Sequence, residues 1–154
     1  MSEVVKKILE PFPHLIIENI YDDEELELIW EELKFLNKPG KMLPPNLYGA
    51  APLPGTGKFA TKARALELDK VYNNKMFSNI LQVNGKVSKK YSREYASLSP
   101  HHVKFLKSNI DFTKIRYYNN GEDYKPHSDD IYDVISCTYF HKEPKKFEGG
   151  ELFF

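Results

Sequence analysis

The pattern of the sequence changes once, near Asn109, from helix-like to strand-like. Before this point, apolar residues recur at the three- and four-residue spacing of amphipathic helices. After it come β-branched or aromatic runs separated by turn residues, at 111–118, 124–129 and 134–141. Helices followed by strands predict an α+β fold, with helices packed on one face of an antiparallel sheet, and not alternating βαβ units.

Composition narrows the class of protein further. With 154 residues and 41% hydrophobic side chains, the chain can build one core, so we expect a single domain. Basic and acidic residues number 22 each, and this zero net charge disfavours nucleic acid and anionic membranes as partners. No apolar run reaches the length of a membrane span, and the single cysteine, Cys137, fits a reducing compartment, so we expect a soluble cytoplasmic protein.

The first 110 residues predict a strand and at least two helices. His14 to Asn19 forms a short apolar run, and Asp22 with Glu25 matches a helix-capping box. The helix that follows should bury a stripe formed by Leu26, Ile29, Trp30, Leu33 and Leu36. Its other face should meet water through Glu27, Glu31, Glu32 and Lys34. A second helix is predicted over 66–81, to be stopped by Asn84-Gly85.

Three features of this region could indicate a binding site. Residues 39–57 are rich in proline and glycine, which predicts a long loop whose role as a lid, a binding loop or a disordered segment stays open. Its Gly55-Thr56-Gly57-Lys58 lacks the first glycine and the Ser/Thr of a phosphate-binding loop, because Pro52 and Phe59 stand there. His101 and His102 are interpreted as the start of a surface helix and not as a metal pair.

The candidate metal ligands are His127 and Asp129. They are two residues apart in a predicted strand, so both side chains leave the same face of the sheet. One further histidine would complete a two-histidine, one-carboxylate set on Fe(II), which leaves open positions for oxygen chemistry. A His-x-Asp pair alone is a weak signal, so its context decides.

The context is the run Tyr117-Tyr118-Asn119-Asn120-Gly121-Glu122-Asp123-Tyr124-Lys125-Pro126-His127-Ser128-Asp129. It resembles the prolyl 4-hydroxylase-like family of Fe(II)- and 2-oxoglutarate-dependent dioxygenases. Cys137-Thr138-Tyr139-Phe140-His141 is similar to the family's next hydrophobic strand, and Phe147-Glu148-Gly149-Gly150-Glu151-Leu152 is similar to its Gly-Gly-Glu turn. The resemblance covers 111–154, with weaker support from 11–36.

The resemblance implies a role for each matching residue. His127 and Asp129 would bind Fe(2+), while Tyr118 and Tyr139 would lie beside the bound 2-oxoglutarate. Cys137 would line the same pocket, as a small buried residue rather than a reactive thiol. Tyr124 would stand at the substrate mouth. For each tyrosine the alternative is an aromatic core residue whose hydroxyl is hydrogen-bonded.

The family fold is an eight-stranded double-stranded β-helix (a jelly roll), whose second half supplies the third metal ligand and the basic partner of 2-oxoglutarate. We therefore expect 1–154 to be a single oxygenase domain cut short after its first barrel strands, with 1–110 as helical support and 111–154 as those strands. His141 matches a non-ligand position. Arg116, on the same strand face as Tyr118, is a reserve partner for a carboxylate.

The expected activity is hydroxylation of a C–H bond in a peptide, protein or small molecule, with succinate and CO2 as co-products. Peptidyl proline is a candidate substrate by resemblance only, and ascorbate is a candidate additional cofactor. A rival interpretation is a non-catalytic interaction module that pairs its open sheet edge with another chain, or with a second copy as a homo-oligomer. A third is a different metalloenzyme that keeps His127 and Asp129 but does not use the two tyrosines.

Overall fold

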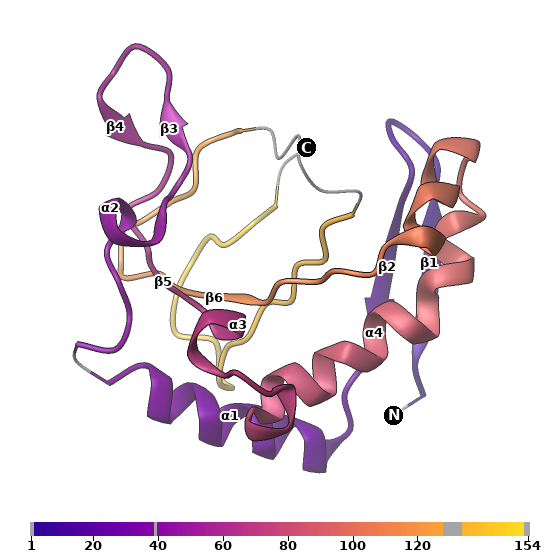
Figure 1. Cartoon of the computed structure of the whole chain (residues 1–154), viewed down its shortest axis with the longest axis horizontal. Helices are drawn as coiled ribbons and strands as arrows, with labels where there is room; N and C mark the ends of the chain where they lie inside the picture. The colour runs from indigo at the N-terminus through magenta and orange to yellow at the C-terminus, as the bar shows by residue number, and fades with distance from the viewer. Residues whose placement is uncertain (1, 39, 128–133, 153–154) are drawn as a thin grey trace.

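The computed structural model describes residues 2–38, 40–127 and 134–152. It is a mixture of helices and small antiparallel sheets, as expected of an α+β chain (Figure 1). Its elements, with 3-10 helices labelled η, are β1 (Val4–Ile8), β2 (His14–Glu18), α1 (Asp23–Leu36), α2 (Pro45–Tyr48), β3 (Pro52–Leu53), β4 (Lys58–Phe59), β5 (Arg64–Glu67), α3 (Leu68–Val71), η1 (Lys75–Phe77), α4 (Asn79–Ala96), η2 (Pro100–Lys107) and β6 (Lys114–Tyr117). The strands pair as β1 with β2, β3 with β4 and β5 with β6, all antiparallel.

Helix α1 begins as its sequence predicts. The Asp22 side chain accepts a hydrogen bond from the Glu25 backbone N–H at 2.8 Å, and the Glu25 carboxylate accepts one from the Asp22 N–H at 3.1 Å. This reciprocal capping box satisfies two backbone donors that the first turn leaves without helical partners. The stripe is buried at Ile29 and Leu36, which confirms the predicted core face.

The prediction that Glu32 faces water is wrong. Its side chain is buried and accepts hydrogen bonds from Ser78 Oγ at 2.7 Å and from the Ile80 N–H at 2.8 Å. Ser78 is the N-cap of α4, so the carboxylate lies where a helix exposes backbone donors and the positive end of its dipole. Glu32 is buried because α4 packs across α1 at this point.

The second helix also differs from its prediction. Residues 66–81 divide among β5, α3, η1 and the first turn of α4, which then continues through Gly85 to Ala96. A glycine inside a helix costs only about 1 kcal/mol, and the buried side chains of Ile80, Leu81 and Val83 outweigh that cost. Among the described residues, no helix is long and apolar enough to cross a membrane.

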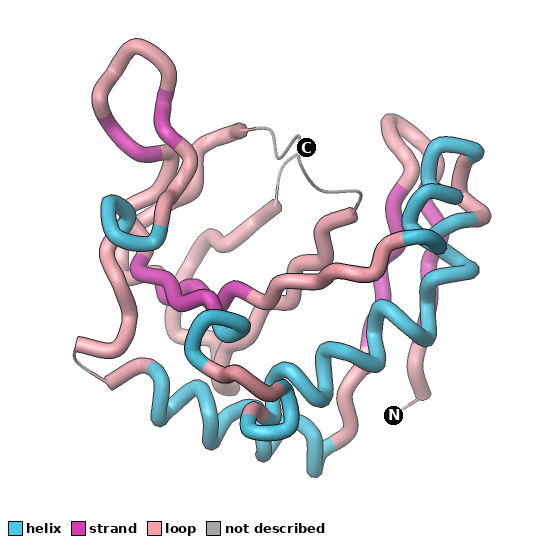
Figure 2. The backbone as a smooth tube through the Cα atoms, in the orientation of Figure 1, coloured by secondary structure: helices cyan, strands magenta, loops and turns pink. Residues whose placement is uncertain are grey.

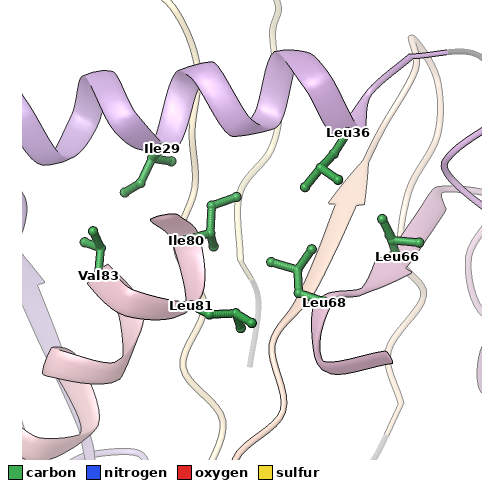
Figure 3. Close-up of a cluster of buried hydrophobic side chains, with 7 residues drawn as sticks. All are labelled: Ile29, Leu36, Leu66, Leu68, Ile80, Leu81 and Val83. Carbon is green, nitrogen blue, oxygen red and sulfur yellow. The ribbon is translucent and has the colours of Figure 1, made fainter. Parts of the chain in front are cut away.

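The main core lies where α1, β5, α3 and α4 meet (Figure 3). Seven buried side chains form it: Ile29, Leu36, Leu66, Leu68, Ile80, Leu81 and Val83. Ile115 of β6 and Phe140 pack against this cluster from outside. The helical layer is therefore attached to the strand-forming part of the chain through apolar side chains.

The prediction of a structureless loop at 39–57 is wrong in part. Two prolines begin the short helix α2, where a proline needs no helical donor, and Gly49 ends it at a φ of +72°. The Tyr48 side chain is buried and its hydroxyl donates to the Ala63 carbonyl at 3.1 Å. Strand β3 pairs with β4 around the Gly55-containing turn. Short-range capping and turn interactions therefore order part of this segment, although it contains no long helix or strand.

The C-terminal strands are fewer and shorter than predicted. The run at 111–118 contains β6, and the run at 124–129 contributes one bridge between Tyr124 and Thr61 before leaving the described residues after 127. No strand is present in the described stretch 134–152, which Figure 2 draws as loop. Aromatic and β-branched residues become strands only beside a hydrogen-bonding partner, and the described residues here offer none. The described part of the chain contains no closed barrel.

Candidate functional site

Strand β6 divides its side chains between the core and a polar face. Ile115 packs on the core cluster, while Lys114 and Arg116 leave the opposite face, as alternation along a strand requires. Arg116 is held in register by pairing with Ala65 of β5. Lys114 forms an ion pair with Glu67 at 3.2 Å.

A short loop, 118–123, follows β6 and leads toward the candidate metal ligands. Tyr117 pairs with Arg64 before the loop and Tyr124 bridges to Thr61 after it, so both ends of the loop lie against the same stretch of chain. Its turn contains Gly121 at a φ of +75°, a conformation that glycine adopts without strain. The Glu122 carboxylate accepts from the Asn119 N–H at 2.7 Å and closes the turn.

Arg116, Tyr124 and His127 form a stack, which we call the Arg116 stack. The Arg116 guanidinium lies 4.7 Å from the centre of the Tyr124 ring, and its Nη2 donates to the Tyr124 hydroxyl at 3.4 Å. The Tyr124 ring also stacks on His127, at 3.9 Å between centroids and 17° between planes. Tyr124 therefore joins a cation of β6 to the candidate metal ligand.

Three further tyrosines surround Arg116. Burial raises the pKa of Tyr118, and the positive charge of Arg116 opposes this rise. The pKa of Tyr118 is raised further by the neighbouring hydroxyls of Tyr124, Tyr139 and Tyr48. Burial likewise raises the pKa of Tyr48, again opposed by Arg116. The four residues Tyr48, Tyr118, Tyr124 and Tyr139 are called the tyrosine cluster below.

Tyr139 belongs to the cluster although it is distant in sequence. Burial raises the pKa of the Tyr139 hydroxyl, the nearby thiol of Cys137 raises it further, and Arg116 lowers it. Because both tyrosines respond to the same guanidinium, the structure brings together Tyr118 and Tyr139, the two residues predicted to lie beside 2-oxoglutarate. Cys137 is exposed, so the prediction that it is a small buried residue is wrong. The described residues place no further strand over this segment to cover it.

The segment around Tyr139 keeps the alternation of a strand without forming one. Phe140 packs 5.9 Å from the ring of Tyr21 and 5.9 Å from that of Trp30, on the helical layer. Thr138 lies beside the Tyr21 hydroxyl and opposes the burial that raises the pKa of that tyrosine. Tyr139 lies between these two residues in sequence but near Arg116, whose positive charge lowers its pKa against the rise caused by burial, and Cys137 lies near Tyr139.

His127 is the only predicted metal ligand whose surroundings the structure describes, since Asp129 lies outside the described residues. The His127 side chain is exposed, and its Nδ1 lies 2.9 Å from the Lys125 carbonyl oxygen. A carbonyl oxygen only accepts, so Nδ1 donates this hydrogen bond, and Nε2 is the ring nitrogen that would bind a metal. Within the described residues, no group of three His, Cys, Asp or Glu side chains gathers as a metal site. One imidazole with a fixed tautomer fits a partial Fe(II) ligand set.

The other histidines are placed elsewhere. His141 lies 3.5 Å from Glu143 and lines an open hollow beside Trp30 of α1, consistent with the non-ligand position expected for it. His102 of η2 is half-buried and packs edge-on against Tyr95 of α4, whereas His101 is exposed, so the surface interpretation is confirmed for His101. Neither location approaches a described carboxylate cluster.

Sequence reasoning missed Tyr48 and ranked Arg116 only as a reserve. Tyr48 lies within the proline-rich segment, and the signal that could have located it is the Pro-Pro helix start followed by Gly49. Its contact with the β6 face depends on tertiary packing, which no local pattern records. The chain matches no protein-family model, no curated protein and no solved structure.

Proposed function

We propose that this chain belongs to an Fe(II)- and 2-oxoglutarate-dependent dioxygenase and carries part of its metal and cosubstrate site. The observation that supports the proposal is the convergence of residues from three separate segments. Tyr118 and Tyr139 lie near Arg116, Cys137 lies near Tyr139, and Tyr124 links the same guanidinium to His127. The sequence resemblance assigns all of them except Arg116 to one pocket. The double-stranded β-helix that would complete that pocket is part of the proposal.

The roles of the residues follow from their chemistry. When bound together, Fe(II) and 2-oxoglutarate supply the oxidising power that inserts oxygen into a substrate C–H bond. His127 would bind the metal through Nε2, with its ring held by the Lys125 carbonyl and the face of Tyr124. Asp129 would add a carboxylate oxygen. Tyr118 and Tyr139, which are protonated at neutral pH like any phenol of ordinary or raised pKa, would donate hydroxyl hydrogen bonds to a cosubstrate carboxylate.

Metal binding by the two proposed ligands is tested by anaerobic calorimetric titration of the chain with Fe(II). His127→Ala and Asp129→Ala should each weaken Fe(II) binding at least about tenfold, because each removes one ligand. His101→Ala is the matched control, since His101 is an exposed histidine on η2. If His101→Ala weakens binding as much as His127→Ala, the metal binds adventitiously and the proposal fails.

Replacing Tyr118 distinguishes the proposed dioxygenase from a different metalloenzyme that uses the same metal ligands. Tyr117 and Tyr118 are equally exposed, at 42% each, but Tyr118 lies in the tyrosine cluster. In the proposed dioxygenase, Tyr118→Phe should weaken 2-oxoglutarate binding to the metal-loaded chain, whereas Tyr117→Phe should not. Unchanged affinity in Tyr118→Phe would favour the other metalloenzyme.

An interaction module is the second candidate, and the exposure of the C-terminal segment favours it. The segment exposes four large hydrophobic side chains by about half or more: Ile135, Tyr139, Phe147 and Leu152. Apolar groups gathered on a surface commonly mark a protein interface. Light scattering separates the two functions, because a stable oligomer that binds neither Fe(II) nor 2-oxoglutarate would support the module and contradict the oxygenase.

A further inference from the structure

We propose that Arg116, stacked on Tyr124, binds a carboxylate group of the substrate, so that the substrate of this protein is an acidic molecule or an acidic peptide. The assignment to the substrate rests on the proposed dioxygenase function, which places Tyr124 at the substrate mouth. The carboxylate site itself rests on the side chains described above. It adds a residue, Arg116, and a substrate class that the sequence resemblance does not supply.

The first argument is the supply of hydrogen-bond donors. A guanidinium carries five N–H donors in a planar fork that matches a carboxylate, and it stays charged at all physiological pH values. Arg116 uses one donor on the Tyr124 hydroxyl, at a long 3.4 Å, and a hydrogen bond with Arg116 also lowers the pKa of Tyr48 against the rise caused by burial. The guanidinium therefore keeps further N–H donors for an anionic ligand.

The second argument is that the Arg116 guanidinium has no carboxylate partner among the residues that the structure describes. Within the described residues, no carboxylate forms an ion pair with Arg116, whereas Lys114 on the same face of β6 is paired with Glu67. The neighbouring acidic residue, Glu122, has its two oxygens engaged by the backbone N–H and side-chain amide of Asn119. A fixed cation beside protonated hydroxyls is suited to an anionic ligand.

The third argument concerns where the ligand would lie. The Tyr124 ring contacts both the Arg116 guanidinium, at 4.7 Å, and the His127 ring, at 3.9 Å between centroids, so an anion on Arg116 lies one aromatic ring away from the proposed metal ligand. Stacking also fixes the plane of the guanidinium, which reduces the side-chain entropy lost on binding. A carboxylate held there would orient the rest of the substrate relative to the metal.

The test is an NMR titration of the full chain with two peptides, acetyl-Gly-Glu-Gly-amide and acetyl-Gly-Gln-Gly-amide. The probe is the Arg116 side-chain N–H signal, assigned by its loss in Arg116→Gln. We expect the Glu peptide to shift this signal saturably and to bind at least about tenfold more tightly than the Gln peptide, because only a carboxylate completes the charged fork. Equal binding of the two peptides would overturn the proposal.

Variants locate the effect. Arg116→Gln should weaken Glu-peptide binding about tenfold or more, and Arg116→Lys, which keeps the charge but loses the fork, should fall between it and the native chain. Arg64→Gln is the matched control, because Arg64 is an exposed arginine on the adjacent strand β5. If Arg64→Gln weakens binding as much as Arg116→Gln, the peptide senses only net charge and the site is refuted.

A final arm separates substrate from cosubstrate. The titration is repeated with Zn(II), a redox-inert substitute for Fe(II), and saturating 2-oxoglutarate. Retained shifting of the Arg116 signal by the Glu peptide supports a substrate site. Displacement of the peptide by 2-oxoglutarate would mean that Arg116 holds the cosubstrate, which overturns the assignment. If neither metal nor 2-oxoglutarate binds but the Glu peptide does, the dioxygenase proposal fails while the carboxylate site stands.

Discussion

At the scale of single residues, Glu32 connects the two main helices. Its carboxylate accepts from Ser78 Oγ, from the Ile80 N–H and from the Tyr72 hydroxyl. A buried carboxylate is stable only when such donors replace its lost hydration. The side chain on α1 therefore serves as part of the N-terminal cap of α4.

Replacing Glu32 tests this connection. Glu32→Ala leaves a buried hydroxyl and a backbone N–H without their acceptor, so we expect a loss of about 1 to 3 kcal/mol in the free energy of unfolding. Glu31→Ala removes an exposed glutamate from the same helix and should change the free energy by no more than about 0.5 kcal/mol. Urea denaturation measures both. Equal losses in the two variants would show that Glu32 has no special role.

The hydrogen bond between Tyr72 and Glu32 should make the stability of the protein depend on pH in alkaline solution. Burial and the hydrogen bond to Glu32 raise the pKa of Tyr72 to about 12, above the usual value of about 10. The unfolded chain then loses the proton first, so the free energy of unfolding should fall as pH rises from about 10 toward about 12. Tyr72→Phe should reduce that slope, and Tyr117→Phe should preserve it. Identical pH profiles for Tyr72→Phe and the native chain would contradict the contact.

At the scale of elements, α4 is determined by its start and by its packed face. Ser78 Oγ accepts from the Leu81 N–H at 3.1 Å and begins the helix. Gly85 lies inside the helix, and a Cβ added there would meet no atom within 4 Å. The glycine therefore weakens α4 without serving a close contact.

Gly85→Ala should stabilise the protein. Alanine restricts the unfolded chain and favours helix, which predicts a gain of up to about 1 kcal/mol in the free energy of unfolding. Gly121→Ala is the opposing control, because Gly121 has a φ of +75° and an alanine there would be strained. Thermal unfolding compares the two. A loss of stability in Gly85→Ala would show that α4 does not continue through this position.

The elements that the sequence predicts well are those determined locally. The capping box and apolar stripe specify α1 within a single stretch of chain, and His14 to Asn19 contains β2. The end predicted for the second helix was wrong because Asn84-Gly85 is a stop signal only where no packed face continues beyond it. The predicted strands at 124–129 and 134–141 depend on distant partners, so β-propensity alone could not establish them.

At the scale of the whole molecule, the candidate site gathers side chains from α2, from β6, from the loop after β6 with the residues that follow it, and from the segment around Tyr139. The family resemblance implied that Tyr118, Cys137 and Tyr139 line one pocket with Tyr124 at its mouth, and the structure places the three tyrosines near Arg116 and Cys137 near Tyr139. Tyr48 reaches the site only because α2 folds against β5, a contact that local sequence patterns do not encode. The cluster is consequently a property of the tertiary fold.

The most direct test of the proposed function is an anaerobic optical titration of the full chain with Fe(II) and 2-oxoglutarate together. If both bind at one site, a weak visible charge-transfer band should appear only when both are present and should be lost in His127→Ala. Its persistence in His101→Ala would tie the band to the proposed ligand. The absence of any band in a folded chain saturated with both reagents would contradict the dioxygenase.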